Sequence, residues 1–168
     1  MIFEKIFVYP DKILTQKAAE VTKIDEQIRQ LADKMAATMY AAPGVGLAAP
    51  QIGISQRLIV ADVGEEKGQN LITLINPIIV SGDGEDGIEE GCLSVPGFTA
   101  PVKRQAEIIV RGYTPEEKEI ELTASGILAI VLQHEIDHLN GILFIDRIGP
   151  VKKDLFQRKF KRGKLQQN

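Results

Sequence analysis

Apolar residues recur every three to four positions in two segments of the chain, and this spacing predicts two amphipathic helices. The first covers residues 26–40 and follows Asp25, whose side chain can cap its N-terminus. Its apolar face consists of Ile28, Leu31, Met35 and Met39. We expect the methionines to fill gaps in the core, because this flexible side chain packs into irregular spaces.

The second helix should begin after Ser125, a suitable N-cap, and end near Leu139, with Gly141 in the C′ position that favours glycine. One face of this helix carries Ile127, Ile130, Val131, His134 and His138. Because the histidines share the apolar face that turns toward the core, we expect them inside the protein rather than in bulk water.

Other segments have the composition of β-strands, which we expect at residues 57–63, 71–80, 106–113 and 118–122. The last two are separated by a short turn and form a hairpin signal. Residues 41–51, with two prolines and two glycines, cannot be a regular helix and should form a structural turn, and the glycine-rich residues 81–87 should be an irregular loop. No repeat or linker is found, so we expect one domain over residues 1–168 with a basic tail from about residue 150.

The composition is that of a soluble globular protein. Among the 168 residues, 26% are charged and 44% are hydrophobic, and the net charge is -3. This balance argues against a nucleic-acid-binding or membrane-surface protein. The N-terminus lacks a signal-peptide pattern and no segment could span a membrane, so we expect a cytoplasmic protein. The one cysteine, Cys92, cannot form an internal disulfide.

The predicted second helix also carries the strongest chemical signal, the sequence His134-Glu135-Ile136-Asp137-His138. Histidines four residues apart lie on one helix face, so both imidazoles can reach one metal ion. Glu135 is rotated by roughly 100° around the helix, which makes it a poor third ligand but places it near a water activated by that metal. This is the H-E-x-x-H pattern of metal-dependent hydrolases. The alternative is a helix with two solvated histidines.

A third ligand has to come from elsewhere in the chain. Zinc peptidases with this motif take a downstream histidine or glutamate, but no histidine follows His138 and residues 139–168 contain no glutamate. Asp146 and Asp154 stay open as oxygen ligands, while Cys92, upstream in a glycine-flanked loop, is the better candidate. A Cys/His/His set leaves the fourth position open, which is typical of catalytic zinc sites.

Three motifs together resemble those of the peptide deformylases, in the family's order and at similar spacing. They are Gly44-Val45-Gly46-Leu47-Ala48-Ala49-Pro50-Gln51, Glu90-Gly91-Cys92-Leu93-Ser94 and Gln133-His134-Glu135-Ile136-Asp137-His138. The likeness covers nearly the whole chain and implies an α+β fold, with antiparallel strands packed around a central helix that carries the HExxH motif. It also implies a metal-dependent hydrolase that removes the formyl group from the N-terminal N-formylmethionine of newly synthesised proteins and releases formate.

The resemblance further implies roles for individual residues. The metal would be held by Cys92, His134 and His138. Glu135 would act as general base and then as general acid, while the Gln51 side-chain amide and the Leu93 backbone N–H would bind the developing oxyanion.

For the substrate, the resemblance implies that Gly46 contacts the peptide backbone. The methionine pocket would be lined by Val45, Ile88, Ile130 and Val131. Thr99 departs from the pattern, because some members carry arginine there, and this leaves contacts to the downstream peptide open.

Ligand chemistry alone favours Zn²⁺, whereas the resemblance points to one divalent ion that is Fe²⁺ in the cell, with Zn²⁺, Ni²⁺ or Co²⁺ in preparations. Thiolate-ligated iron in air would expose Cys92 to oxidation. Two other readings remain. A structural zinc-binding module would need a fourth protein ligand, and a metallopeptidase or amidase of broader specificity would cleave unformylated peptides.

The end of the chain is strongly basic. Residues 152–164 contain seven Lys and Arg residues and one Asp, a net charge of +6 in a chain whose total is -3. This tail is either a solvated helix or a contact with ribosomes, where N-formylmethionyl peptides and nascent chains emerge. We expect a monomer and no membrane partner.

Overall fold

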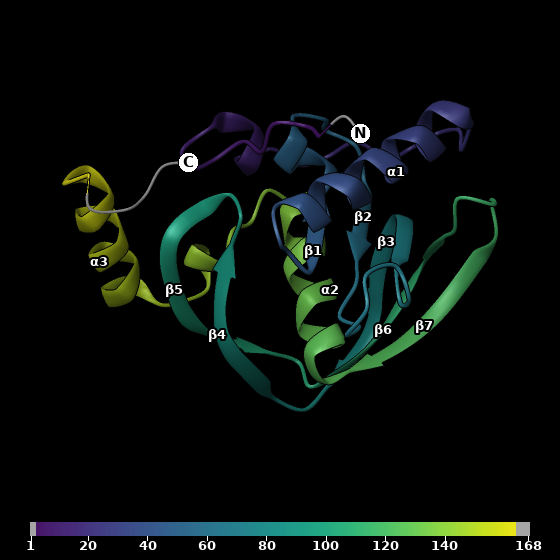
Figure 1. Ribbon diagram of the computed structural model, residues 1–168. Coiled ribbons are helices and arrows are strands. Elements are labelled where there is room, and N and C mark those ends of the chain that lie inside the picture. Colours follow the sequence, from purple (N-terminus) through teal and green to yellow (C-terminus); the bar gives the residue numbers. More distant parts are fainter. Residues whose placement is uncertain (1–2, 164–168) are drawn as a thin grey trace.

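The structure is a computed structural model that describes residues 3–163 and has an α+β architecture (Figure 1). The α-helices are α1 (Glu26–Ala41), α2 (Gly126–Leu139) and α3 (Pro150–Lys161), and the short 3-10 helices are η1 (Lys12–Thr15), η2 (Ala49–Ile52) and η3 (Phe144–Asp146). The strands are β1 (Gly46–Ala48), β2 (Leu58–Ala61), β3 (Ile72–Asp83), β4 (Asp86–Cys92), β5 (Val95–Arg104), β6 (Glu107–Tyr113) and β7 (Glu119–Ser125). Among residues 3–163, no helix combines the length and the apolar character that crossing a membrane requires.

The strands form two antiparallel layers around α2. Five of them make one sheet in the order β1-β2-β3-β6-β7, while β4 and β5 pair in a separate two-stranded ribbon. Figure 1 shows α2 between this sheet and the ribbon, so the helix is surrounded by strands. The expected α+β fold with a central HExxH helix is confirmed.

The short strand β2 is buried on both faces. All four of its residues are fully buried and alternate between two hydrophobic clusters. Ile59 and Ala61 belong to the cluster around α2, whereas Leu58 and Val60 belong to the cluster around α1. The apolar run is therefore a strand with a helix on each side, which is why it lacks polar alternation.

A third cluster attaches α3 to the ribbon through aromatic side chains. The ring centroid of Phe98 on β5 lies 6.2 Å from that of Phe144 and 5.0 Å from that of Phe156 on α3. Tyr9, from the N-terminal arm, packs edge-on against Phe156 and Phe160. Helix α3 thus sits at one end of the molecule (Figure 1), anchored by one face.

Most of the predicted elements are confirmed. Helix α1 starts at Glu26, and the Asp25 carboxylate accepts the Ile28 N–H at 3.1 Å as an N-cap. Both methionines of its apolar face are completely buried. The hairpin appears as β6 and β7, and residues 41–51 contain β1 and η2 rather than a regular α-helix. Ser125 precedes α2 as expected, although its side chain makes no capping hydrogen bond among the described residues.

Residues 81–87 are not the irregular loop that their glycines predict. Strand β3 continues to Asp83 and β4 begins at Asp86. Gly87 lies within β4, and this position requires glycine because a Cβ there would collide with the carbonyl oxygen of Val102 on β5. Glycine at this position marks a close approach of two strands, not a break between elements.

The position of Cys92 also differs from the prediction. It is the last residue of β4 rather than part of a loop. The sequence pattern also fails to predict β5, because Pro96, Gly97 and Pro101 are unfavourable in a central strand. In a two-stranded ribbon each strand has one edge that pairs with no other strand. A residue that cannot donate a hydrogen bond on that edge therefore costs no inter-strand hydrogen bond.

Candidate metal centre and active site

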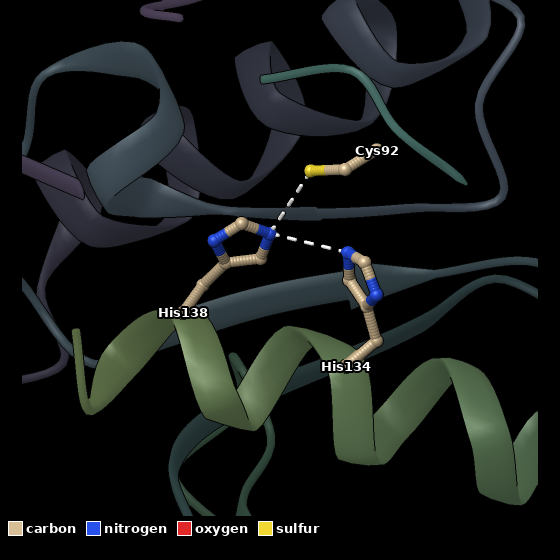
Figure 2. Close-up of side chains that lie close together, drawn as sticks. All are labelled: Cys92, His134 and His138. Carbon is tan, nitrogen blue, oxygen red and sulfur yellow. Dashed lines mark hydrogen bonds between the residues drawn. The ribbon is translucent and has the colours of Figure 1, made fainter. Parts of the chain in front are cut away.

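Three potential metal ligands meet on the face of α2 that turns toward the ribbon. The Sγ atom of Cys92 lies 3.4 Å from Nε2 of His138, and that nitrogen lies 3.2 Å from Nε2 of His134 (Figure 2). All three ligand atoms lie within 4.8 Å of one another. These separations fit one tetrahedral ion, with metal–nitrogen bonds of ~2.0–2.1 Å and a metal–sulfur bond of ~2.3 Å.

Two elements bring the ligands together. Helix α2 presents both imidazoles because positions 134 and 138 are one turn apart, and the end of β4 brings Cys92 over them. The backbone N–H of Ser94 donates to Sγ of Cys92 at 3.4 Å and helps to orient the side chain. The alternative ligands Asp146 and Asp154 take no part, since both form ion pairs with basic residues of α3.

The two histidines have different surroundings. Nδ1 of His134 lies 2.8 Å from Oε1 of Glu90, whereas Nδ1 of His138 is buried without a hydrogen-bond partner in the described part of the chain. Burial lowers the pKa of His134, but contacts with Cys92 and Glu90 outweigh it and hold the pKa well above its ordinary value. Burial and the nearby charges of His134 and Arg104 hold the pKa of His138 well below its ordinary value.

Glu135 lies beside the ligands without being one of them. Its carboxylate is buried, and Oε2 has no hydrogen-bond partner within residues 3–163. Burial raises the pKa of Glu135 to about 7, although the positive charges of His134 and Arg104 oppose the shift. Gly46 leaves room for this side chain, because a Cβ there would lie 2.5 Å from Oε1 of Glu135. A carboxyl group that titrates near neutrality is suited to accepting and returning a proton.

Gln51 has a fixed orientation on the other side of Cys92. Its Oε1 accepts the backbone N–H of Ala48 at 2.9 Å, so the amide nitrogen faces the site. Nε2 donates to Oγ of Ser94 at 3.1 Å and lies 3.7 Å from Sγ of Cys92. Leu93 directly follows the cysteine and lines the same pocket.

A pocket of about 380 Å³ opens next to these residues. Its lining includes all the substrate-binding residues that the family resemblance implies, which are Val45, Gly46, Ile88, Ile130 and Val131. Gln51, Cys92, Leu93, His134 and Glu135 also line it. One expectation about the α2 face is wrong: Ile127 is 56% exposed, because it lies in the first turn of the helix, at the margin of the core.

Several polar residues around the site were not predicted. Glu90 contacts His134, and Arg104 and Asp137 lie behind it in a buried ionic network that reaches Arg147. Their spacing from the ligands could have indicated two of them. Glu90 is two residues from Cys92, the spacing of one strand face, and Asp137 is three residues after His134, the spacing of one helix face.

Thr99, at which we expected a departure from the family pattern, is exposed on β5. Its hydroxyl donates to Oε1 of Glu89 at 3.0 Å. Glu89 belongs to the lining of the pocket, so this contact lies at the edge of the site.

Comparison with known proteins gives a consistent result. The family model described as polypeptide deformylase matches residues 3–154. The peptide deformylase of Syntrophobacter fumaroxidans is 56% identical over 158 residues, covering 94% of this chain and 93% of the relative. That of Thermodesulfovibrio yellowstonii is 52% identical, covering 98% of this chain and 100% of the relative.

Solved structures agree with the sequences. A crystal structure of a peptide deformylase from Legionella pneumophila superimposes with a TM-score of 0.90 and 45% identity, covering 99% of this chain and 100% of that one. With the Cys/His/His cluster on α2 and β4, these matches show that the chain belongs to the peptide deformylases, metal-dependent hydrolases that remove N-terminal formyl groups.

Proposed function

We propose that Cys92, His134 and His138 hold one divalent ion, which is Fe²⁺ in the cell. The observation that carries this assignment is the convergence of the three ligand atoms within 4.8 Å beside the pocket. Thiolate and imidazole ligands accept iron as well as zinc, and we choose Fe²⁺ because of the resemblance to the deformylases. Oxidation of Cys92 in air would then destroy the site.

Glu135 moves the proton during the reaction. The bound ion supplies Lewis acidity, so that a water molecule can be deprotonated near neutral pH and attack the formyl carbon. Glu135 takes the proton of that water through Oε2, the oxygen that has no other partner among the described residues. It then returns the proton to the amine that leaves as formate is released, acting first as base and then as acid.

Gln51 and the backbone of Leu93 stabilise the oxyanion that develops on the formyl oxygen. The Gln51 amide is already oriented by Ala48, so little reorganisation is needed when Nε2 turns from Ser94 to the substrate. The Leu93 N–H lies next to the metal ligand in sequence and provides a second donor. Each such donor is typically worth about 3 kcal/mol in the transition state.

The apolar part of the pocket selects methionine. Ile130 and Val131 are buried on α2, and Val45, Gly46 and Ile88 also line the pocket. Burying the methionine side chain there contributes roughly 1.5–3 kcal/mol. A formyl group carries only hydrogen on its acyl carbon, whereas acetyl would push a methyl group into the reacting atoms.

The deciding experiment measures formate release and kcat/KM on three peptides with the Fe²⁺ or Ni²⁺ enzyme. Formyl-Met-Ala-Ser should exceed formyl-Ala-Ala-Ser by roughly 10- to 200-fold, and acetyl-Met-Ala-Ser by more, because a displacement of about 1 Å can cost roughly 100-fold. Comparable rates on the formyl-Met and acetyl-Met peptides would contradict the proposal and favour a broader amidase.

The basic helix α3 provides a contact with ribosomes, where formylated nascent chains emerge in the cytoplasm. Ion pairs hold Lys153 and Arg158. Within residues 3–163, four exposed basic side chains of this region have no acidic partner: Lys152, Lys159, Lys161 and Arg162. Such charges can neutralise phosphates of RNA. We expect a single chain, acting as a monomer and as one domain, to suffice for activity, because every proposed catalytic residue comes from it.

A further inference from the structure

A row of alternating charges leads from His134 to the protein surface. Glu90 accepts from His134 through Oε1 at 2.8 Å, and Arg104 donates two hydrogen bonds of 2.8 Å to the same carboxylate. A third nitrogen of Arg104 donates to Asp137 at 2.6 Å. Arg147 completes the row with two hydrogen bonds to Asp137, at 2.6 and 2.7 Å.

The members of this row differ sharply in exposure. The side chains of Arg104, Glu90 and Asp137 are 3%, 4% and 10% exposed, whereas that of Arg147 is 43% exposed. Two carboxylates and two guanidinium groups balance each other. Removing the partner of a buried charge leaves that charge uncompensated, so the position of each inner group depends on the next one outward.

We propose that Arg147 is a positioning residue for the metal centre, acting on His134 through Asp137, Arg104 and Glu90. By holding Asp137 it keeps Arg104 clamped on Glu90, and Glu90 then keeps the Nδ1–H of His134 as a donor. That tautomer directs the lone pair of Nε2 at the metal. The inference rests on the proposed role of His134 as a ligand.

Geometry supports a positioning role over simple surface pairing. Asp137 lies three residues after His134 on α2, so the clamp from Arg147 acts on the same helix turn that carries the ligand. Arg104 and Glu90 come from β5 and β4, and Glu90 is two residues from Cys92. The row therefore connects the elements that bear all three ligands. His138 has no equivalent support among residues 3–163, because its Nδ1 lacks a partner.

The chain offers a matched control. Arg111 on β6 is 45% exposed and also pairs with acidic side chains, those of Glu119 and Glu121, but these are exposed residues of the β6–β7 hairpin. The experiment compares Arg147→Ala, Arg147→Lys and Arg111→Ala with the wild type, all loaded with Zn²⁺. The rate of Zn²⁺ loss to excess EDTA is followed with a metal-sensitive dye.

We expect Arg147→Ala to lose Zn²⁺ roughly 3- to 10-fold faster than the wild type. Removing a residue that is hydrogen-bonded directly to a metal ligand typically costs about 10- to 100-fold, and Arg147 acts less directly. Arg147→Lys keeps the positive charge but can contact Asp137 through only one nitrogen. Its rate of Zn²⁺ loss should lie between those of Arg147→Ala and the wild type. Arg111→Ala should match the wild type. Equal rates for Arg147→Ala and the wild type would overturn the proposal.

A spectroscopic readout separates positioning from stability. The chain has only two histidines, so ¹⁵N-histidine NMR of the Zn²⁺ protein resolves each ring. In the wild type the Nδ1–H of His134 should be visible and slow to exchange with water, and in Arg147→Ala it should exchange faster. An unchanged exchange rate with reduced thermal stability would mean that Arg147 only stabilises the fold, and would overturn the proposal. If His134→Ala retains Zn²⁺ as the wild type does, the ligand assignment itself is wrong.

Discussion

The reactive side of the pocket and its rim are built in opposite ways. On the reactive side, Gln51, Glu135 and His138 are almost completely buried, and short hydrogen bonds hold Gln51 and His134 in place. On the rim, Val45 and Ile88 are 51% and 42% exposed. Both regions line or adjoin the same 380 Å³ space.

The difference follows from what each region has to do. A proton transfer or an oxyanion contact depends on positions within a fraction of an ångström, and buried, hydrogen-bonded groups can hold them. Hydrophobic contact with a flexible methionine is non-directional and tolerates movement. Substitutions on the reactive side should therefore change kcat by orders of magnitude, and substitutions on the rim should change kcat/KM by small factors.

The largest effect is expected from Glu135→Gln. The amide keeps the size of the side chain but cannot accept the proton, so kcat should fall by about 100- to 10,000-fold. Steady-state kinetics on formyl-Met-Ala-Ser, together with metal analysis, test this.

The variant should still bind about one metal ion per chain, because Glu135 is not among the three clustered ligands. A metal-free Glu135→Gln protein, or one with normal turnover, would remove Glu135 from the role of proton carrier.

Metal removal should change the reactivity of Cys92 by at least about tenfold, because the thiolate is both the nucleophile and the ligand. This is the only cysteine of the chain, so labelling by a thiol reagent reports on the metal site alone. The metal-free protein should react faster than the Zn²⁺ protein. Equal labelling rates would argue against Cys92 as a ligand.

How far the sequence predicts this site depends on the range of the interactions. The placement of both histidines follows from the 3.6-residue period of α2, which is a local property. The Cys92 contact could be predicted only by eliminating other ligands and by family resemblance, because 46 residues separate it from His138. The ion pair between Arg104 and Asp137 joins residues 33 positions apart, and no local sequence pattern predicts it.

The same contrast applies to the fold. Helix α1 was predictable because its apolar residues follow the helical period, and strand β2 because it is a short continuous run of β-branched and aliphatic residues. Strand β5 was not, because Pro96, Gly97 and Pro101 are acceptable only in a ribbon with free edges. The role of Gly87 is likewise apparent only in the folded ribbon, where the carbonyl oxygen of Val102 on β5 takes the space of a Cβ.

A smaller effect is expected at the rim. Ile88→Ala removes apolar surface from a half-exposed side chain, at a cost of about 1 kcal/mol. This corresponds to roughly a fivefold loss of kcat/KM on formyl-Met-Ala-Ser. The formyl-Ala peptide should be nearly unaffected, since it does not reach the same surface.

Ile78→Ala is the matched control, because Ile78 is 50% exposed on β3 and does not belong to the pocket lining. It should leave both peptides unchanged. A loss of several hundred-fold for Ile88→Ala would contradict the division between the reactive side and the rim.

The smallest effect on peptide hydrolysis is expected from the basic helix, which lies outside both regions. Replacing Lys152, Lys159, Lys161 and Arg162 by Gln removes four charges but keeps Phe156, whose burial attaches α3 to the ribbon. Hydrolysis of a short peptide should therefore stay within about twofold of the wild type, as for other exposed substitutions far from a site. Ribosome pelleting at low salt should weaken, and the slope of log K against log salt should become shallower, because fewer counterions are released from RNA. The control removes four exposed lysines elsewhere on the surface, which are Lys12, Lys17, Lys23 and Lys118. If both quadruple variants pellet alike, only net charge matters and α3 is a solvated helix without a specific contact.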